Sequence, residues 1–134
     1  MKNIFLDTNI LFDIILERDK NSKIIIQGLK KIPPSKLYIS SLSVHIIFYV
    51  LKIRYGSLEY DRIKNFLTKM NILPLSESIT LEAISNEFFD FEDKLQYLCA
   101  IDKCDIIVTR DVKDFNRIKK TIPSNIVIVD SLEV

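Results

Sequence analysis

Five short apolar runs, each of the length of a β-strand, constrain the fold of this chain more than any other feature. They are Asn3–Leu6, Leu37–Ser40, Ile72–Leu75, Asp105–Thr109 and Asn125–Val129. The longer segments between them carry apolar residues three or four positions apart, as in Phe91, Leu95, Leu98 and Ile101, and this spacing predicts helices. Strands that alternate with helices and are apolar at every position indicate a parallel sheet covered on both faces. The sequence therefore predicts an α/β fold.

The longest of the intervening segments, residues 43–70, predicts two helices in a hairpin. Ile46, Tyr49, Val50 and Ile53 have helical spacing in its first half. The break is expected at Tyr55–Ser57, where Gly56 can adopt the left-handed conformation at the end of the first helix and Ser57 can cap the second.

Length and composition exclude several classes of protein. A chain of 134 residues predicts a single domain over residues 1–134. The net charge of +1 excludes a basic nucleic-acid coat and an acidic disordered tail, so any nucleic-acid surface must be local. No uncharged run reaches the roughly 18 residues of a membrane span. The two cysteines, Cys99 and Cys104, do not form a disulfide framework, and a cytoplasmic location is expected.

Acidic residues follow the expected strands at places that would meet in the folded chain. Asp7 ends the first run, Asp111 and Asp114 follow the fourth, and the acids of Asp90–Asp93 open the helix that leads into the fourth. Ligands of open parallel sheets bind beyond the carboxyl ends of the strands, where these groups would gather. Clustered carboxylates repel one another unless a cation lies among them, and oxygen ligands suit Mg²⁺ or Mn²⁺. The pattern predicts a shared metal site.

Each acid also has a simpler interpretation. Asp7 and Asp111 could cap the helices that follow them, and Asp90 with Asp93 resembles an acidic capping arrangement. A receiver-like phosphoacceptor domain would also place acids beyond strand ends. It fits poorly, because the third expected strand ends in Pro-Leu-Ser without an acid and the fifth lacks a terminal lysine.

The remaining polar and aromatic candidates carry weaker signals. His45, the single histidine, lies in an apolar helical stretch and is expected to be a core or interface residue. Phe48, Tyr49, Tyr55, Tyr60 and Phe66 are expected mainly in the core or an interface. If Tyr55 or Tyr60 is exposed, it could stack on a nucleic-acid base beside basic side chains. The candidate RNA contacts are Lys52, Arg54, Lys64 and Arg110.

The two ends of the chain resemble the PIN-domain family, which includes the bacterial VapC toxins. The resemblance rests on DTNILFDIILER at the start and FEDKLQYLCAIDKCDIIVTRDVKDF near the end, together with the alternating strands and helices between them. It implies a doubly wound sheet and a Mg²⁺- or Mn²⁺-dependent ribonuclease. It also implies that Asp7, Asp93 and Asp111 are the metal ligands, Asp93 being chosen for its spacing to Ala100.

The resemblance assigns supporting roles as well. Asn9 would orient the first acid and Thr109 would support the site from the strand end, while Glu92 and Asp114 are substitutes for a ligand. One family position departs from the pattern, because Ile46 stands where a glutamate is common. Two functions are therefore expected: the toxin of a toxin-antitoxin pair, which cuts RNA, forms a homodimer and binds an antitoxin, or a catalytically weak module that binds RNA or protein.

Overall fold

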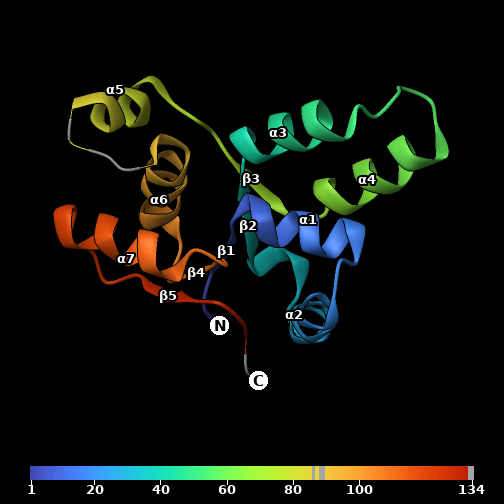
Figure 1. The fold of residues 1–134 in the computed structure, drawn as a ribbon, viewed down its shortest axis with the longest axis horizontal. Coiled ribbons are helices and arrows are strands. Elements are labelled where there is room, and N and C mark those ends of the chain that lie inside the picture. Colours follow the sequence, from blue (N-terminus) through green and yellow to red (C-terminus); the bar gives the residue numbers. More distant parts are fainter. Residues whose placement is uncertain (86, 88–89, 133–134) are drawn as a thin grey trace.

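The computed structural model of the chain describes residues 1–85, 87 and 90–132. It contains a five-stranded parallel sheet in the order β3-β2-β1-β4-β5 (Figure 1). The strands are β1 (Ile4–Leu6), β2 (Leu37–Ser40), β3 (Asn71–Leu73), β4 (Ile106–Val108) and β5 (Val127–Val129). The predicted α/β fold with a five-stranded parallel sheet is confirmed.

β3 ends before Pro74 and not at Leu75, because proline has no N–H to donate to a neighbouring strand.

Seven α-helices flank this sheet within the described residues. They are α1 (Thr8–Leu16), α2 (Lys20–Lys30), α3 (Ser41–Leu51), α4 (Leu58–Thr68), α5 (Glu77–Ser85), α6 (Phe91–Lys103) and α7 (Val112–Thr121). A short 3₁₀ turn, Pro34–Lys36, leads into β2. Figure 1 shows α1 to α4 on one side of the molecule and α5 to α7 on the other. No helix in the described ranges is long and apolar enough to cross a bilayer.

The side chains of β1 alternate between the two faces of the sheet. Ile4 and Leu6 join a hydrophobic cluster formed with residues of α1 to α4, whereas Phe5 joins a second cluster formed with α5, α6 and α7. All three are buried. Both faces are covered by helices, so an apolar residue is needed at every position of the strand, which explains why the run in the sequence is continuous.

The predicted helical hairpin is present, but its first helix ends earlier than expected. α3 stops at Leu51, and Lys52 takes the left-handed conformation (φ 50°) that was expected of Gly56. Gly56 is also left-handed (φ 83°), but it lies in the connection between the helices. Ser57 caps α4 as predicted, and its hydroxyl accepts a hydrogen bond from the Tyr60 amide (3.0 Å).

Side chains on the outer face of the hairpin differ from the expected core pattern. Tyr49 is 75% exposed, and the exposed His45 stacks on it with ring centroids 6.0 Å apart. His45 is therefore not a core residue. Tyr55 is also exposed and contacts Tyr60, and Phe48 packs partly buried against the core. The helical spacing predicted the helix correctly but not which of its faces would be buried.

Candidate metal centre

The carboxyl ends of β1 and β4 lie side by side and bring two of the predicted acids together. Leu6 pairs with Val108, and the next amide, that of Asp7, donates to the Val108 carbonyl (3.0 Å). The turn after β4 then carries Asp111 to the start of α7. One carboxylate oxygen from each of Asp7, Asp93 and Asp111 lies within 4.8 Å of the others. The three acids chosen from the sequence thus form one cluster.

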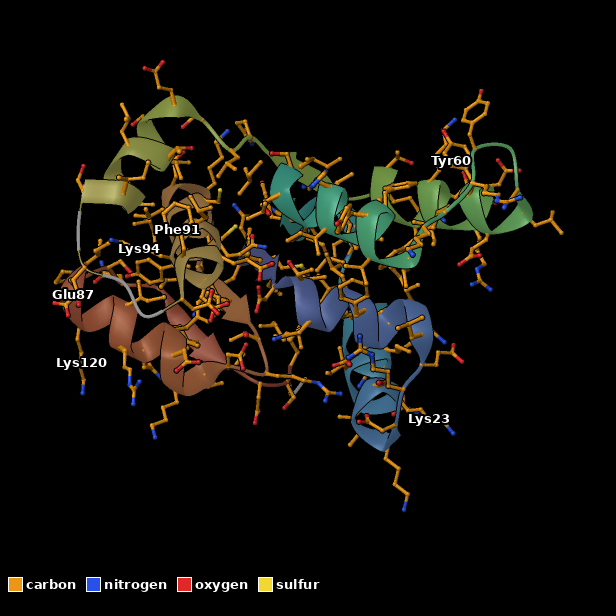
Figure 2. All side chains as sticks on the ribbon, turned by 45° about the horizontal axis from the view of Figure 1, so that its top comes forward. Lys23, Tyr60, Glu87, Phe91, Lys94 and Lys120 are labelled. Carbon is orange, nitrogen blue, oxygen red and sulfur yellow. The ribbon has the colours of Figure 1, made fainter. Side chains whose placement is uncertain are left out.

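Asp93 reaches the cluster because local contacts set where α6 begins. The Asp90 carboxylate accepts a hydrogen bond from the Asp93 amide (3.0 Å) and caps the helix, which places Asp93 in its first turn. The next residue, Lys94, is buried and its Nζ donates to the carbonyls of Ala83 (3.0 Å) and Glu87 (3.2 Å). Both Lys94 and Glu87 are labelled in Figure 2. These contacts tie the start of α6 to the end of α5.

Thr109 connects the first and last acids of the cluster. Its hydroxyl donates to Oδ2 of Asp7 (2.8 Å) and accepts from the Asp111 amide (3.0 Å). Oδ1 of Asp7 accepts a hydrogen bond from the Thr8 amide (2.8 Å). Both oxygens of Asp7 are therefore held in fixed directions by groups just beyond the ends of β1 and β4.

Asn9 contacts a different acid from the one predicted. Its Nδ2 donates to Oδ2 of Asp111 (3.2 Å), and its Oδ1 accepts from the Arg110 amide (3.3 Å). The expectation that Asn9 orients the first acid is wrong in this structure. Asn9 lies in the first turn of α1 and faces the turn after β4, so its amide bridges to that turn and orients Asp111.

Burial and mutual repulsion make the cluster electrostatically unfavourable when its acids are charged. Desolvation raises the pKa of Asp7 to about 7 and outweighs the lowering effect of its hydrogen bonds to Thr109 and Thr8, while repulsion from Asp111 and Glu92 raises it slightly further. Desolvation also raises the pKa of Asp93 to about 8, followed by repulsion from Asp7, Asp90 and Asp111. Three clustered carboxylates that repel one another fit a hard divalent cation, because its charge would offset the repulsion.

The two substitute acids stay outside the three-residue cluster. Glu92 borders the same cleft, and burial together with Asp90 and Asp111 raises its pKa. Asp114 instead forms an ion pair with Arg117 (3.9 Å) on α7. Capping explains part of the acidic pattern, since Asp90 caps α6, but the Asp111 side chain makes no capping hydrogen bond.

A cleft of about 230 Å³ opens above the acids, and one wall of it is apolar. Its lining residues are Asp7, Thr8, Asn9, Phe12, Ile46, Asp90, Glu92, Asp93 and Asp111. Ile46 therefore faces the cleft at the position where the family resemblance leads us to expect a glutamate. Phe12 was not singled out from the sequence, because a phenylalanine in an apolar helix indicates only core packing.

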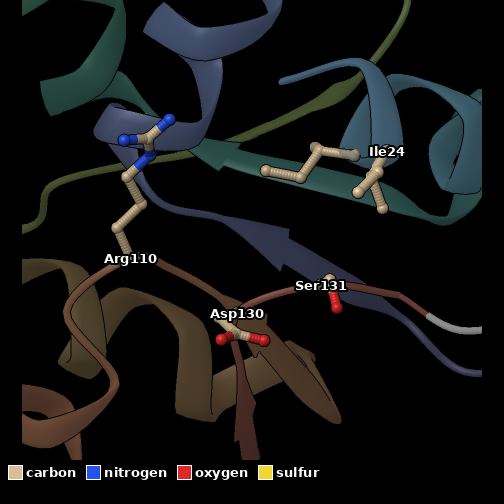
Figure 3. Close-up of a pocket in the computed structure, with 5 residues that line it drawn as sticks. Ile24, Arg110, Asp130 and Ser131 are labelled. Carbon is tan, nitrogen blue, oxygen red and sulfur yellow. The ribbon is translucent and has the colours of Figure 1, made fainter. Parts of the chain in front are cut away.

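Arg110 adjoins the cluster but is held by two other acids. Its Nε donates to Oδ2 of the fully buried Asp13 (2.5 Å), and Nη2 pairs with Asp19 (3.2 Å). Figure 3 shows the side chain reaching from the turn after β4 toward α1, at the edge of a pocket of about 340 Å³ that Ile24 and Asp130 also line. Asp13 was missed in the sequence, although a charged residue inside the apolar run ILFDIIL is a detectable signal.

The first prediction separates the neighbouring acids of α6. Successive helical residues point about 100° apart, so Asp93 and Glu92 do not reach the same ion directly. We expect Asp93→Asn to weaken Mn²⁺ binding by at least about tenfold and Glu92→Gln by less than about threefold. Titration calorimetry on the two charge-neutralising variants measures this. A larger loss for Glu92→Gln would mean that Glu92, and not Asp93, is the ligand on this helix.

The second prediction uses the apolar wall of the cleft. Since Ile46 lines the cleft, Ile46→Glu should add a fourth carboxylate and tighten Mn²⁺ binding by about tenfold, at some cost in packing. Ile46→Gln is the matched control, because glutamine has nearly the shape of glutamate but carries no charge. Equal affinities of the two variants, measured by calorimetry, would show that position 46 does not reach the ion.

Comparison with known proteins places this geometry in a family. Residues 3–113 match the PIN domain family. The chain is 29% identical over 118 residues to "Ribonuclease VapC1" of Aquifex aeolicus (strain VF5), with 82% of each chain covered.

Two solved structures have the same fold. The toxin-antitoxin complex from Klebsiella pneumoniae aligns with a TM-score of 0.68 at 24% identity, covering 98% of this chain and 100% of that one. DNA-bound VapBC from Salmonella typhimurium aligns with a TM-score of 0.68 at 19% identity, covering 96% and 97%. The chain therefore belongs to the PIN-domain family, and the relatives that it resembles are VapC-like toxin ribonucleases.

Proposed function

We propose that this protein is a divalent-metal-dependent endoribonuclease that hydrolyses RNA phosphodiester bonds. The observation that carries the proposal is the convergence of Asp7, Asp93 and Asp111 at the strand ends, in a cleft open to a substrate. These three residues would hold Mg²⁺ or Mn²⁺. Such an ion, when bound, supplies an activated water and neutralises the charge that develops on the phosphate. The similarity to a VapC ribonuclease supports the choice of RNA as substrate.

The protein's own groups have distinct parts in this function. Asp7 and Asp111 are proposed as direct ligands, and Asp93 as a ligand or as the acceptor of a water on the ion. Thr109 holds Asp7 and the backbone of Asp111 in place, and Asn9 holds the Asp111 carboxylate. The reaction needs no protein nucleophile, so the side chains contribute position and charge.

The direct test is incubation of the purified protein with mixed cellular RNA, with Mn²⁺, with Mg²⁺ and with a chelator. New RNA ends that form only in the presence of metal support the proposal. Intact RNA under all three conditions favours the second candidate, a catalytically weak module that binds RNA or protein. The apolar Ile46 in the cleft is the observation that favours this second function.

The third prediction concerns stability and needs no substrate. Metal binds only where the acids are gathered, so Mn²⁺ at about a hundred times its dissociation constant should add roughly 2.7 kcal/mol to the free energy of unfolding. Thermal melts with and without chelator measure the shift, and Asp7→Asn serves as the control that should not respond. Superimposable wild-type melts at millimolar Mn²⁺ would contradict the metal site.

We further propose that the protein acts as the toxin of a toxin-antitoxin pair in the cytoplasm, as a homodimer inhibited by a cognate antitoxin. Fold neighbours that are toxin-antitoxin complexes support the antitoxin partner. A neighbouring gene for a short DNA-binding protein, and its copurification with this chain, would test the pairing. Light scattering on the purified protein would test the dimer.

Contact with RNA outside the cleft is proposed for the basic residues of the hairpin and of the turn after β4. Lys52 and Arg54 are exposed in the connection between α3 and α4, and Lys64 is exposed on α4. Arg110 is closest in sequence to the acids, but its guanidinium is paired with Asp13 and Asp19. An RNA phosphate would have to share this guanidinium with the two carboxylates.

A further inference from the structure

A buried polar group beneath the acidic cleft belongs to none of the proposed ligands. Gln96 of α6 is fully buried, and its Oε1 accepts a hydrogen bond from the Ser40 hydroxyl (2.6 Å). Its Nε2 donates to Thr8 Oγ1 (2.7 Å) and to Ser43 Oγ (2.8 Å). Both N–H bonds and the carbonyl of this amide are therefore used. We call these four residues the Gln96 network.

The three hydroxyl groups of the Gln96 network are also joined to one another. Thr8 Oγ1 and Ser43 Oγ are 2.7 Å apart, and Ser40 Oγ and Ser43 Oγ are 3.3 Å apart. Ser40 Oγ also accepts from the Ser43 amide (3.1 Å). All four side chains are buried. A buried amide that loses its partners pays the full cost of desolvation, so the network strongly favours the one arrangement of helices in which every group is bonded.

Three of the four members of the network, Thr8, Gln96 and Ser43, lie within one helical turn of a residue that lines the cleft. Thr8 follows Asp7 directly, Gln96 is one helical turn after Asp93, and Ser43 is one turn before Ile46. Residues three positions apart on a helix share a face. Figure 1 shows α6 on one side of the strand ends and α1 and α3 on the other. The network thus joins the three segments that form the walls of the site.

We propose that Gln96 is a positioning residue that sets α6 against α1 and α3, so that the Asp93 carboxylate lies beside Asp7. Packing alone does not need an amide here, because neighbouring buried residues of α6 such as Leu95, Leu98 and Ala100 are apolar. The three hydrogen bonds of the amide are directional, so they fix both the rotation of α6 about its axis and its position along that axis. Apolar contacts alone leave both adjustable. This inference rests on the proposed metal-dependent function.

The test compares two changes at adjacent positions of the same helix. Gln96→Met keeps the length and volume of the side chain but removes its hydrogen bonds. Tyr97→Phe is the matched control, because the Tyr97 hydroxyl donates to the Ile122 carbonyl and contacts Ser124 on the side of α6 away from the site. Calorimetry should show Mn²⁺ binding weakened by about 10- to 100-fold in Gln96→Met and changed by less than about twofold in Tyr97→Phe. Equal affinities in Gln96→Met and the wild type would overturn the proposal.

A second readout does not depend on metal. Hydrogen exchange of the Asp93 amide and of the first turn of α6, in the metal-free protein, should be faster in Gln96→Met than in Tyr97→Phe. If the wild type binds no Mn²⁺, the proposed function fails, and this exchange rate alone decides whether Gln96 positions the helix. If Gln96→Met does not fold, Ser43→Ala removes one partner of the amide, and unchanged Mn²⁺ affinity and exchange in that variant would overturn the proposal.

Discussion

Asp7→Asn is expected to abolish metal-dependent RNA cleavage while the protein remains folded. Changes to residues that only support metal ligands commonly cost 10- to 100-fold in activity, so loss of a ligand charge should cost more than about a hundredfold. The asparagine has the shape of the aspartate and can still bond to Thr109 and to the Thr8 amide, which now hold the carboxylate. RNA cleavage at saturating Mn²⁺ and circular dichroism of the same preparation measure the two outcomes. Cleavage near the wild-type rate would remove Asp7 from the proposed mechanism.

The same substitution should stabilise the metal-free protein at high pH. The pKa of Asp7 is raised by burial from 3.8 to about 7, so the folded state binds this proton more tightly than the unfolded state. The contribution of Asp7 to stability is therefore greatest below pH 4 and is lost as the pH rises through about 7. Asparagine does not ionise, so the variant should exceed the wild type by about 4 kcal/mol at pH 8 and match it near pH 4.

Urea unfolding in chelator at pH 4 and pH 8 measures the difference in stability between Asp7→Asn and the wild type. The same measurement with Mn²⁺ distinguishes a metal ligand from an ordinary buried aspartate. Added Mn²⁺ should reverse the order at pH 8, because only the wild type keeps the full set of ligands. A variant that is less stable than the wild type at pH 8 without metal would mean that the hydrogen bonds of Asp7 outweigh its desolvation.

Arg110→Ala is expected to lower the free energy of unfolding by about 3 kcal/mol, because it leaves the Asp13 charge buried without a cation. The side chain of Asp13 is 0% exposed, and its Oδ2 accepts from Arg110. Among the described residues, its other oxygen, Oδ1, has no hydrogen-bond partner. Arg110 is therefore the main group that compensates this carboxylate.

A double variant tests the pairing. Asp13→Leu with Arg110→Met removes both charges, and this double variant should recover most of the stability that Arg110→Ala loses. Asp114→Asn is the control, since the pair of Asp114 and Arg117 has both side chains 46% exposed and should contribute less than about 0.5 kcal/mol. A loss below about 1 kcal/mol in Arg110→Ala would show that water reaches Asp13.

The stable double variant also separates two roles of Arg110. If its RNA cleavage matches that of the wild type, Arg110 acts through Asp13 and does not contact RNA. Reduced cleavage in a protein of normal stability would support the predicted RNA contact. The single variant does not distinguish these roles, because the turn that carries Asp111 begins at Thr109 and Arg110.

The architecture could be predicted from local patterns. Continuous apolar runs and helical spacing depend on which side chains a segment must bury, and a sheet buried on both faces imposes this requirement on every strand, as Ile4, Phe5 and Leu6 show. Acids placed directly after strands were also informative, because parallel strands bring their carboxyl ends to one edge. Asp7 and Asp111 meet for that reason.

The sequence by itself determined the order of the elements, the parallel sheet and the edge where the acids gather. The tertiary structure alone decided that Asn9 bonds to Asp111, 102 positions away, that Arg110 is held by Asp13, and that Gln96 joins α6 to α1 and α3. It also decided that the left-handed residue at the end of α3 is Lys52 and not the predicted Gly56. The physical reason is that periodicity reports which face of an element is buried, whereas a hydrogen-bond partner depends on distances between elements that only their packing sets.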